Sequence, residues 1–320
     1  MVGAVLVYND RIIGEGYHRQ YGEAHAEVNC INNVSETDLP MVEKSTLYVS
    51  LEPCAHFGKT PPCADLIIEK KIPLVVIGCR DSFDQVDGKG IQKLLAAGIK
   101  VITPVLEKQA LELNKRFFTF HNEQRPYIIL KWAQTVNGKI ANRDYSRMLI
   151  SNEITNREVH KWRSREMAIL VGTNTALHDN PSLTTRLWPG NNPVRLVIDR
   201  KLKLPSTLRL FDGTVKTIVF NTIQHLEMDN LLYHKISNDQ SIVTQILEAL
   251  YQLKIQSVLV EGGTQVLQSF IDENYWDEAI VITNTTSAAK DGIQAPSLTN
   301  GRKISGDKFY ADTIDRYIHI

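Results

Sequence analysis

The sequence is short of cysteine, balanced in charge and free of long apolar segments. Only four cysteines occur in 320 residues, too few for a disulfide-stapled secreted domain. Lysine plus arginine and aspartate plus glutamate each number 36, and without a basic surplus nucleic acid is a disfavoured partner. No segment approaches the roughly eighteen consecutive apolar residues that span a membrane. The start, MVGAVLVYND, lacks the basic region and cleavage site of a signal peptide. We therefore expect a cytoplasmic protein without a nucleic-acid or membrane partner.

The length and the residue pattern predict two globular domains. A chain of 320 residues, 43% of them apolar, exceeds one average domain and can build more than one core. Short apolar runs alternate with helical patterns throughout, which is typical of α/β folds. The polar segment NEQRP, residues 122–126, separates two such series. We therefore predict domains at residues 1–123 and 124–320.

Each series predicts a buried sheet between helices. In the first series we expect strands at residues 2–8, 11–17, 46–50, 74–79 and 100–104, and helices at 24–33, 63–71, 90–97 and 106–122. In the second we expect strands at residues 127–132, 167–171, 194–199, 217–220, 257–260 and 279–283, and helices at 152–164, 242–253 and 264–274.

Four residues of the first domain have the composition of a catalytic zinc site. A catalytic zinc takes three protein ligands and leaves a fourth position to water, and His25, Cys54 and Cys63 can supply the three. Glu27 then remains free to carry protons between that water and a leaving amine. Residues two apart do not share a helix face. We therefore expect His25 and Glu27 to begin a helix, with the metal beyond its end.

Taken alone, each of these four residues is more often structural, as a buried histidine or a small buried thiol. Their occurrence together and in this order favours a zinc site over a structural role. Zinc deaminases carry H-x-E followed by P-C-x-x-C; here eight residues rather than two separate the cysteines, which indicates one branch of them. Cys30 and Cys79 lie in apolar runs and are expected in the core. His56 is a candidate substrate contact without a zinc role.

The second domain lacks the G-x-G-x-x-G fingerprint of ordinary dinucleotide-binding folds. Instead, a buried strand runs into Glu261-Gly262-Gly263 and then a helix, whose first N–H groups could face a phosphate. An ordinary turn is the alternative. A polar stretch at residues 172–186, GTNTALHDNPSLTTR, follows another strand. We expect a ligand-binding loop there, because open α/β sheets bind ligands at the carboxyl ends of their strands.

These motifs resemble those of the RibD family, the bifunctional deaminase/reductases of riboflavin biosynthesis. HAEV and SLEPCAHFGKTPPC resemble its deaminase half, and LKWAQTVNGKIA with the Gly-Gly segment resembles its reductase half. The resemblance implies a cytidine-deaminase-like three-layer α/β/α domain and then a dihydrofolate-reductase-like α/β domain. It also implies zinc-dependent hydrolytic deamination of a diaminopyrimidine ribotide, followed by NADPH-dependent reduction of its ribosyl group to ribityl. A homodimer or homotetramer is implied as well.

The resemblance assigns roles residue by residue. The zinc ligands would be His25, Cys54 and Cys63, with Glu27 as proton donor, and HFGKTPPC (residues 56–63) would help to hold the substrate. The NADPH contacts would be Ala133, Leu149, Thr175, Asp179, Arg200, Gly263, Thr264, Gln265, Val266, Leu267, Gln268 and Ser269. The substrate contacts would be Ser146 (Arg147 if the alignment shifts by one), Arg163, Leu183, Arg186 and Glu261. Guanidinium forks suit a ribose phosphate, which favours Arg163 and Arg186 as clamps. Lys131 either assists the reduction or is a structural strand-end lysine.

Three departures from the family pattern leave alternatives open. Relatives carry an N-terminal helix and a Pro-Asn-Pro-x-Val-Gly turn before the first strand, whereas this chain begins MVG, so an N-terminal segment is expected to be missing. RDSFDQVDGKG, residues 80–90, stands where relatives often show Asp-Pro-Asn-Pro, and Leu149 stands where many have tryptophan. The alternatives are a reductase with a structural or impaired deaminase half, and a deaminase of free nucleosides or of tRNA.

Overall fold

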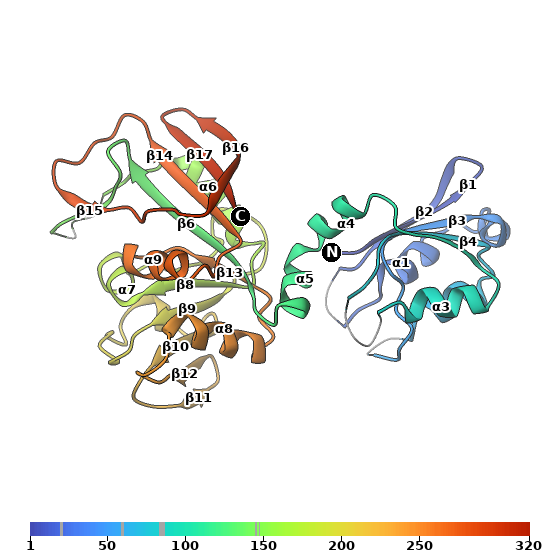
Figure 1. Cartoon of the computed structure of the whole chain (residues 1–320), viewed down its shortest axis with the longest axis horizontal. Helices are drawn as coiled ribbons and strands as arrows, with labels where there is room; N and C mark the ends of the chain where they lie inside the picture. Colours follow the sequence, from blue (N-terminus) through green and yellow to red (C-terminus); the bar gives the residue numbers. More distant parts are fainter. Residues whose placement is uncertain (20–21, 59–60, 83–86, 145, 147) are drawn as a thin grey trace. The chain divides into compact units, whose positions relative to one another are not determined.

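The computed structural model describes residues 1–19, 22–58, 61–82, 87–144, 146 and 148–320 (Figure 1). Contacts between Cα atoms divide the chain into two compact units, Met1–Glu123 and Gln124–Ile320. Within the described ranges, no helix combines the length and the apolar character that crossing a membrane requires.

The first unit is built on one five-stranded sheet with the order β2-β1-β3-β4-β5. β1 pairs antiparallel with β2 and β3, whereas β3, β4 and β5 run parallel. The strands are β1 (Gly3–Tyr8), β2 (Arg11–Tyr17), β3 (Thr46–Leu51), β4 (Leu74–Cys79) and β5 (Lys100–Ile102). The helices are α1 (Ala26–Asn32), η1 (Leu39–Lys44), α2 (Cys63–Glu69), α3 (Lys89–Ala96), α4 (Glu107–Leu113) and α5 (Lys115–Asn122).

In the first unit the expected burial of two cysteines is confirmed, and the expected extent of one helix is wrong. Cys30 and Cys79 lie in the core, with 0% and 1% exposure. Asn9 and Asp10 join β1 to β2 with φ of 48° and 59°, as a tight hairpin turn requires. The single helix expected at residues 106–122 is instead two helices that meet at Asn114. The buried Asn114 side chain donates to the Ala110 carbonyl, a local bond that competes with helical continuation.

The second unit contains a ten-stranded mixed sheet with the order β11-β12-β10-β9-β8-β13-β6-β14-β17-β16, and a small β15-β7 sheet. From β12 to β14 the neighbours are parallel, and β11, β17 and β16 join antiparallel. The strands are β6 (Tyr127–Thr135), β7 (Lys139–Asn142), β8 (Ala168–Gly172), β9 (Val194–Ile198), β10 (Thr217–Asn221), β11 (Leu226–Met228), β12 (Leu231–Lys235), β13 (Ser257–Val260), β14 (Glu278–Asn284), β15 (Gly292–Gln294), β16 (Gly301–Phe309) and β17 (Asp312–His319). The helices are α6 (Glu153–Arg163), α7 (Thr173–Asp179), η2 (Arg209–Phe211), α8 (Ile242–Gln252) and α9 (Thr264–Asp272).

Helices cover both faces of this sheet (Figure 1). Ile128 and Leu130 point to the face that α8 and α9 cover, and Tyr127 and Ile129 point to the face covered by α6 and α7. β8 and β13 are buried along their whole length, as expected of parallel strands enclosed on two sides. The stretch at residues 172–186, expected to be a loop, begins with the helix α7, so that part of the prediction is wrong.

Candidate zinc and cofactor sites

His25 and Glu27 stand at the start of α1, as the spacing predicted. His25 is the residue before the helix, with extended backbone (φ −69°, ψ 167°), so its ring lies beyond the first turn. Glu27 lies within that turn and is buried, with 3% exposure. The two side chains can therefore serve one site although they are only two positions apart.

The structure brings the three predicted zinc ligands together. Cys63 is the first residue of α2 and follows the extended Pro62. Nδ1 of His25 lies 3.3 Å from Sγ of Cys63 and 3.6 Å from Sγ of Cys54. All three ligand atoms lie within 4.8 Å of one another. Ligands placed about 2.0–2.3 Å from one tetrahedral zinc lie roughly 3.5–3.8 Å apart. The separations and the donor set of one imidazole and two sulfurs therefore fit zinc.

The residues of this cluster shift one another's pKa values. The Cys63 thiol and backbone N–H both bond to Cys54 Sγ, which with His25 lowers the pKa of Cys54 even though burial opposes this. The pKa of Cys63 is raised, because it donates to Cys54 and is buried. A bound metal would displace the protons that its ligands carry. Burial raises the pKa of Glu27 to about 6, near the value that suits a proton carrier at neutral pH.

Two residues beside the cluster were not found from the sequence. His18 follows β2, its ring meets His25 edge-on at 5.3 Å, and its Nδ1 lies 3.2 Å from the Ala24 carbonyl. Glu52, in SLEPC, is buried directly after β3. No spacing rule indicates His18, and only its nearness to HAE in the sequence could have suggested it. Of the segment expected to hold substrate, His56 is described, whereas Lys59 and Thr60 lie outside the described residues.

Removal of one ligand tests the cluster. Cys63→Ser is expected to weaken zinc binding by more than about 100-fold, since even residues that only support a ligand are worth 10–100-fold. Cys79→Ser is the matched control, because Cys79 is equally buried but is not one of the three clustered ligands. Zinc content after dialysis against a weak chelator measures the effect. Equal zinc in the two variants would exclude Cys63 as a ligand.

In the second unit, two strand ends meet where the cofactor was predicted. β8 leads into α7, and β13 leads through Glu261-Gly262-Gly263 into α9. A Cβ at Gly262 would lie 3.0 Å from Thr175 Cγ2, and a Cβ at Gly172 would lie 2.9 Å from Val266 Cγ2. Gly263 has a φ of 72°, which favours glycine. The predicted NADPH residues Thr175, Gly263 and Val266 are therefore in one place.

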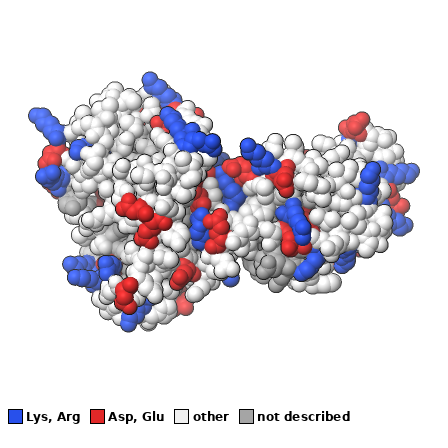
Figure 2. Space-filling model, viewed as in Figure 1, with Lys and Arg blue, Asp and Glu red and all other residues white. Residues whose placement is uncertain are grey.

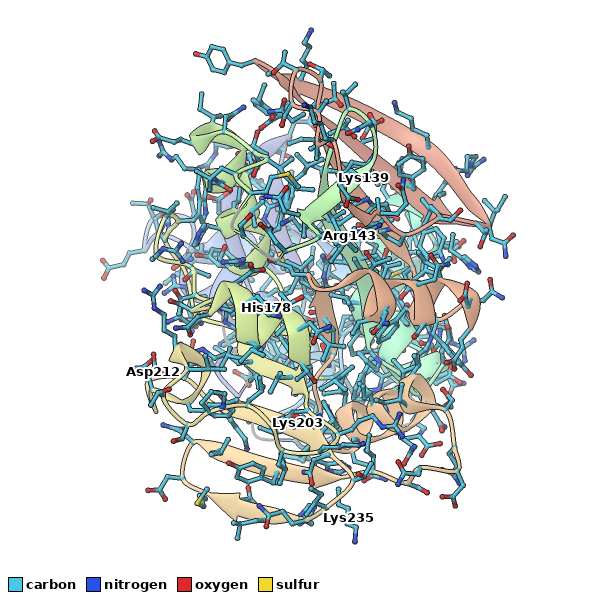
Figure 3. The ribbon with its side chains drawn as sticks, turned by 90° about the vertical axis from the view of Figure 1, so that its left-hand side faces the viewer. Lys139, Arg143, His178, Lys203, Asp212 and Lys235 are labelled. Carbon is cyan, nitrogen blue, oxygen red and sulfur yellow. The ribbon has the colours of Figure 1, made fainter. Side chains whose placement is uncertain are left out.

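The other predicted cofactor residues are more dispersed. Asp179 ends α7, and the exposed Arg200 follows β9 and donates to Asn238. Ala133 lies within β6, and Leu149 is 75% exposed between β7 and α6. Within α9, Leu267 packs into the core, whereas Thr264 donates to Gln294, Gln268 to Asp272 and Ser269 to Gln265. Figure 3 looks onto this side of the unit, with His178 on α7 and Lys139 on β7.

Glu261 is the centre of a buried ion network. Arg163 on α6 donates to both carboxylate oxygens at 2.7 Å, and Lys131 on β6 lies 3.7 Å away. Burial raises the pKa of Glu261, but the two cations outweigh it and lower the value to about 2. Burial also lowers the pKa of Lys131. The network ties α6 and β6 to the segment after β13.

α6 also holds the loop that carries two predicted substrate residues. Nη1 of Arg163 donates to the Thr184 carbonyl at 3.4 Å, and Nδ1 of His160 accepts from Leu187 N–H at 3.5 Å. Leu183, directly before the first of these points, is buried with a φ of 50°, and Arg186, between them, is exposed. Because Nε and Nη2 of Arg163 are bonded to Glu261, Nη1 is the nitrogen that faces this loop.

The last predicted substrate residue lies in a different segment. Ser146 is exposed, and its hydroxyl accepts from Asn142 at 3.0 Å. The alternative, Arg147, lies outside the described residues.

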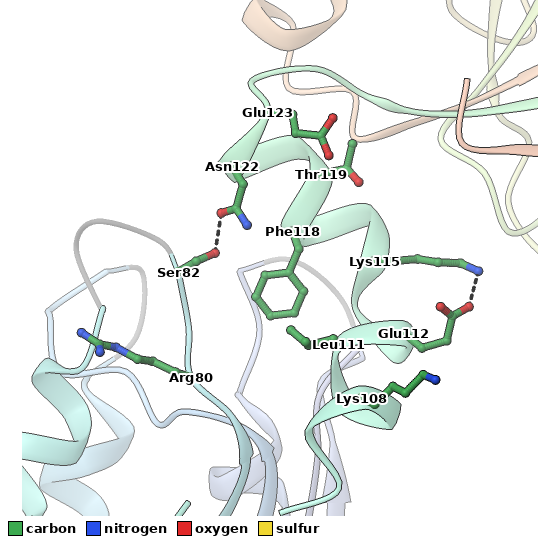
Figure 4. A pocket seen from close by; sticks show the side chains of 10 residues that line it. All are labelled: Arg80, Ser82, Lys108, Leu111, Glu112, Lys115, Phe118, Thr119, Asn122 and Glu123. Atoms are coloured by element: carbon green, nitrogen blue, oxygen red, sulfur yellow. Dashed lines mark hydrogen bonds and ion pairs between the residues drawn. The ribbon is translucent and has the colours of Figure 1, made fainter. Parts of the chain in front are cut away.

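Two surface hollows are lined by other residues. The first, of about 490 Å³, is in the first unit beside α4 and α5, where Ser82 bonds to Asn122 (Figure 4). The second, of about 340 Å³, lies beside Leu210 and Leu231. None of the described residues that line them is a predicted zinc, cofactor or substrate residue.

Comparison with known families matches both halves of the chain. Residues 126–286 match the RibD C-terminal domain, and residues 1–79 match the cytidine and deoxycytidylate deaminase zinc-binding region. The chain is 39% identical to the riboflavin biosynthesis protein RibD of Aquifex aeolicus, over 88% of this chain and 79% of that protein. It is 40% identical to the protein of the same name from Bacillus amyloliquefaciens, over 94% of this chain and 82% of that one.

A solved structure resembles the whole chain. It is described as a diaminohydroxyphosphoribosylaminopyrimidine deaminase/5-amino-6-(5-phosphoribosylamino)uracil reductase from Thermotoga maritima, and it matches with a TM-score of 0.89 at 36% identity. The match covers 100% of this chain and 92% of that one. The expected fold class, with a cytidine-deaminase-like unit first and a reductase unit second, is confirmed.

Proposed function

This chain belongs to the RibD family, and from that premise we propose which of its residues perform the two reactions. It is a bifunctional deaminase and reductase of riboflavin biosynthesis, since both halves and the whole chain match such proteins. The two alternatives, a reductase with an inactive first half and a deaminase of nucleosides or tRNA, receive no support from these matches. The convergence of His25, Cys54 and Cys63 beside the buried Glu27 carries the assignment of the first site.

In the proposed deamination, His25, Cys54 and Cys63 hold the zinc. Bound zinc lowers the pKa of a water molecule and so supplies a nucleophile at neutral pH. Glu27 would take a proton from the attacking water and give it to the departing amine. Its burial matters, because a pKa of about 6 lets the carboxyl group both accept and release a proton near neutral pH. The substrate is a diaminopyrimidine ribotide, and its amino group leaves as ammonia.

In the proposed reduction, the second unit positions the deaminated product against NADPH. Thr175, Gly263 and Val266 would receive NADPH where α7 and α9 begin, and the cofactor would supply the hydride that, together with a proton from water, converts the opened ribose to ribityl. Arg163 on α6 and Arg186 in the loop after α7 are the proposed contacts to the substrate. Glu261 fixes Arg163, so that the protein contributes chiefly orientation, which is a large catalytic term.

The proposal extends to the protein's surroundings. Acidic and basic side chains are interspersed on the face shown in Figure 2, which supports a small-molecule substrate rather than nucleic acid. The four cysteines form no disulfide, which supports a cytoplasmic location for the proposed enzyme. The family resemblance supports a homodimer or homotetramer, which sedimentation velocity measures.

Product analysis tests the two reactions together. The purified chain is incubated with the diaminopyrimidine ribotide in water enriched in heavy oxygen, with and without deuterated NADPH. We expect one heavy oxygen in the pyrimidine product without NADPH, and one deuterium in addition when NADPH is present. Unchanged substrate in both reactions would contradict the proposal, and heavy oxygen without deuterium would contradict its second half.

Gly263 provides a test of the cofactor site. Gly263→Ala is expected to weaken NADPH binding by about 10-fold, because strain at a positive φ costs about 1–3 kcal/mol and the new Cβ would lie 3.3 Å from Thr175 Oγ1. Gly213→Ala is the matched control, since Gly213 has a similar φ of 74° but open space around its Cβ. Quenching of tryptophan fluorescence measures binding, since all four tryptophans lie in residues 124–320. Equal affinities in the two variants would contradict the assignment.

A further inference from the structure

Glu52 accepts hydrogen bonds from three separate backbone positions. Its Oε1 accepts from Ile91 N–H at 3.1 Å, and its Oε2 accepts from Gly88 N–H at 3.0 Å and Asp81 N–H at 3.3 Å. Its own N–H donates to the Cys79 carbonyl at 3.0 Å. The residue is 4% exposed. Both its backbone and its side chain are therefore held at the point where β3 ends.

These bonds make Glu52 the cap of a helix that has none of its own. α3 begins after Gly88, which has a φ of 82° and no side chain with which to cap. The first N–H groups of a helix lack partners within it, and here a carboxylate from β3 satisfies two of them, at Gly88 and Ile91. The third bond, to Asp81, reaches the residues that follow β4. One carboxylate thus joins the end of β3, the end of β4 and the start of α3.

The start of α3 also packs against Pro53, which directly precedes the predicted metal ligand Cys54. α3 packs so closely on this segment that a Cβ at Gly90 would lie 1.9 Å from the Pro53 carbonyl oxygen and 3.2 Å from Glu52 Oε1. On the other side, the Cys54 carbonyl accepts from Ala64 N–H of α2 at 3.1 Å. The backbone of Cys54 is therefore held between two helices, by α2 directly and by α3 through Glu52 and Pro53.

We propose that Glu52 is a positioning residue for the metal site: its carboxylate sets the place of Cys54 Sγ by fixing the start of α3 against Pro53. The inference rests on the proposed zinc site. The side-chain hydrogen bonds described for Glu52 go to backbone N–H groups, not to the side chains of the three ligands, so the role proposed for it is positioning. Its loss would leave three N–H groups unsatisfied and would free the segment 52–54 to shift. Residues that orient metal ligands in this indirect way are worth 10–100-fold in metal affinity.

Cobalt(II) is the probe, because thiolate ligation gives it an intense absorption that reports on the positions of the sulfurs. Glu52→Gln and Glu52→Ala are expected to weaken cobalt binding by about 10–100-fold and to shift its visible spectrum. Glutamine still accepts on one side but presents an N–H group to the donors on the other. Glu69→Gln is the matched control, since it makes the same change at an exposed site on α2. NADPH-dependent reductase turnover in the same chains is expected to stay within about twofold of wild type, because Glu52 and the predicted cofactor residues belong to different compact units.

Gly90→Ala disturbs the packing of α3 on Pro53 from the other side, because its Cβ would lie 1.9 Å from the Pro53 carbonyl oxygen. It is expected to reproduce the spectral shift although Glu52 is unchanged. Amide hydrogen exchange in β1 and β4 is expected to stay as in wild type. Wild-type affinity and spectrum in both Glu52 variants would overturn the proposal while leaving the zinc site intact. Loss of exchange protection throughout β1 and β4 would overturn it too, because Glu52 would then be a general stabiliser. Absence of cobalt–thiolate absorption in the wild type would overturn the metal site itself, and the inference with it.

Discussion

Replacing Glu27 with glutamine is expected to slow deamination by about 10²–10⁴-fold, the usual worth of a positioned proton carrier. Glutamine matches glutamate in size and keeps the start of α1 filled, but it cannot accept and release the proton that the leaving amine needs. Glu27 is buried beside the three clustered ligands and has a raised pKa of about 6. We therefore expect the loss to fall on kcat, with zinc content unchanged. Ammonia release from the diaminopyrimidine ribotide measures it.

The chain provides two controls for this variant. Reductase turnover, measured on the deaminated substrate, is expected to be unaffected, because Glu27 and the predicted cofactor residues belong to different compact units. Glu36→Gln makes the same change at an exposed residue of the first unit and is expected to behave as wild type. Deamination by Glu27→Gln within tenfold of wild type would remove the carboxyl group from the mechanism.

Loss of one partner of the Arg163–Glu261 pair has the largest expected effect on stability. Arg163→Met leaves the Glu261 carboxylate buried, with Lys131, 3.7 Å away, as its remaining ion-pair partner among the residues that the structure describes. Removal of one member of a buried ion pair costs about 3–5 kcal/mol. We expect that decrease in the free energy of unfolding of the second unit, together with loss of reductase activity. Tryptophan fluorescence during denaturation follows it, since the four tryptophans report on this unit alone.

A double variant separates stability from catalysis. Arg163→Met with Glu261→Met replaces the pair by apolar side chains, an exchange that is often neutral or stabilising. Stability is therefore expected to return in large part while reduction stays absent, because the group that orients the substrate is gone. Lys303→Met is the surface control, since Lys303 pairs with Asp315 at 52% exposure and exposed pairs contribute about 0–1 kcal/mol. A double variant that regained reductase activity would show that the pair serves stability only.

The zinc site was predictable because short sequence segments determine where its ligands lie. His25 and Glu27 can converge only at a helix start, and Pro62 before Cys63 indicates another helix start, so the spacing alone carried the geometry. The role of Glu52 was not predictable in this way. Its partners lie 29 to 39 positions away along the chain, and they are backbone N–H groups that no residue type marks.

The second unit shows the same division. Buried parallel strands such as β8 and β13 were found because their apolar runs are continuous, whereas β16, exposed along nearly all of its length, has no apolar period to detect. The sequence of α7 is polar and likewise has no apolar period, so it predicts a loop where the structure has a helix. Arg163 and Glu261 were singled out only through family resemblance, since 98 positions separate them and nothing local indicates that they meet.

X-ray absorption at the zinc edge of the purified protein tests the central claim most directly. If His25, Cys54 and Cys63 hold one zinc, the spectrum will show two sulfur scatterers at about 2.3 Å and one imidazole nitrogen at about 2.0 Å, with one further light atom. One sulfur will disappear in Cys63→Ser. A wild-type spectrum with only nitrogen and oxygen neighbours, or one that Cys63→Ser leaves unchanged, would contradict the account.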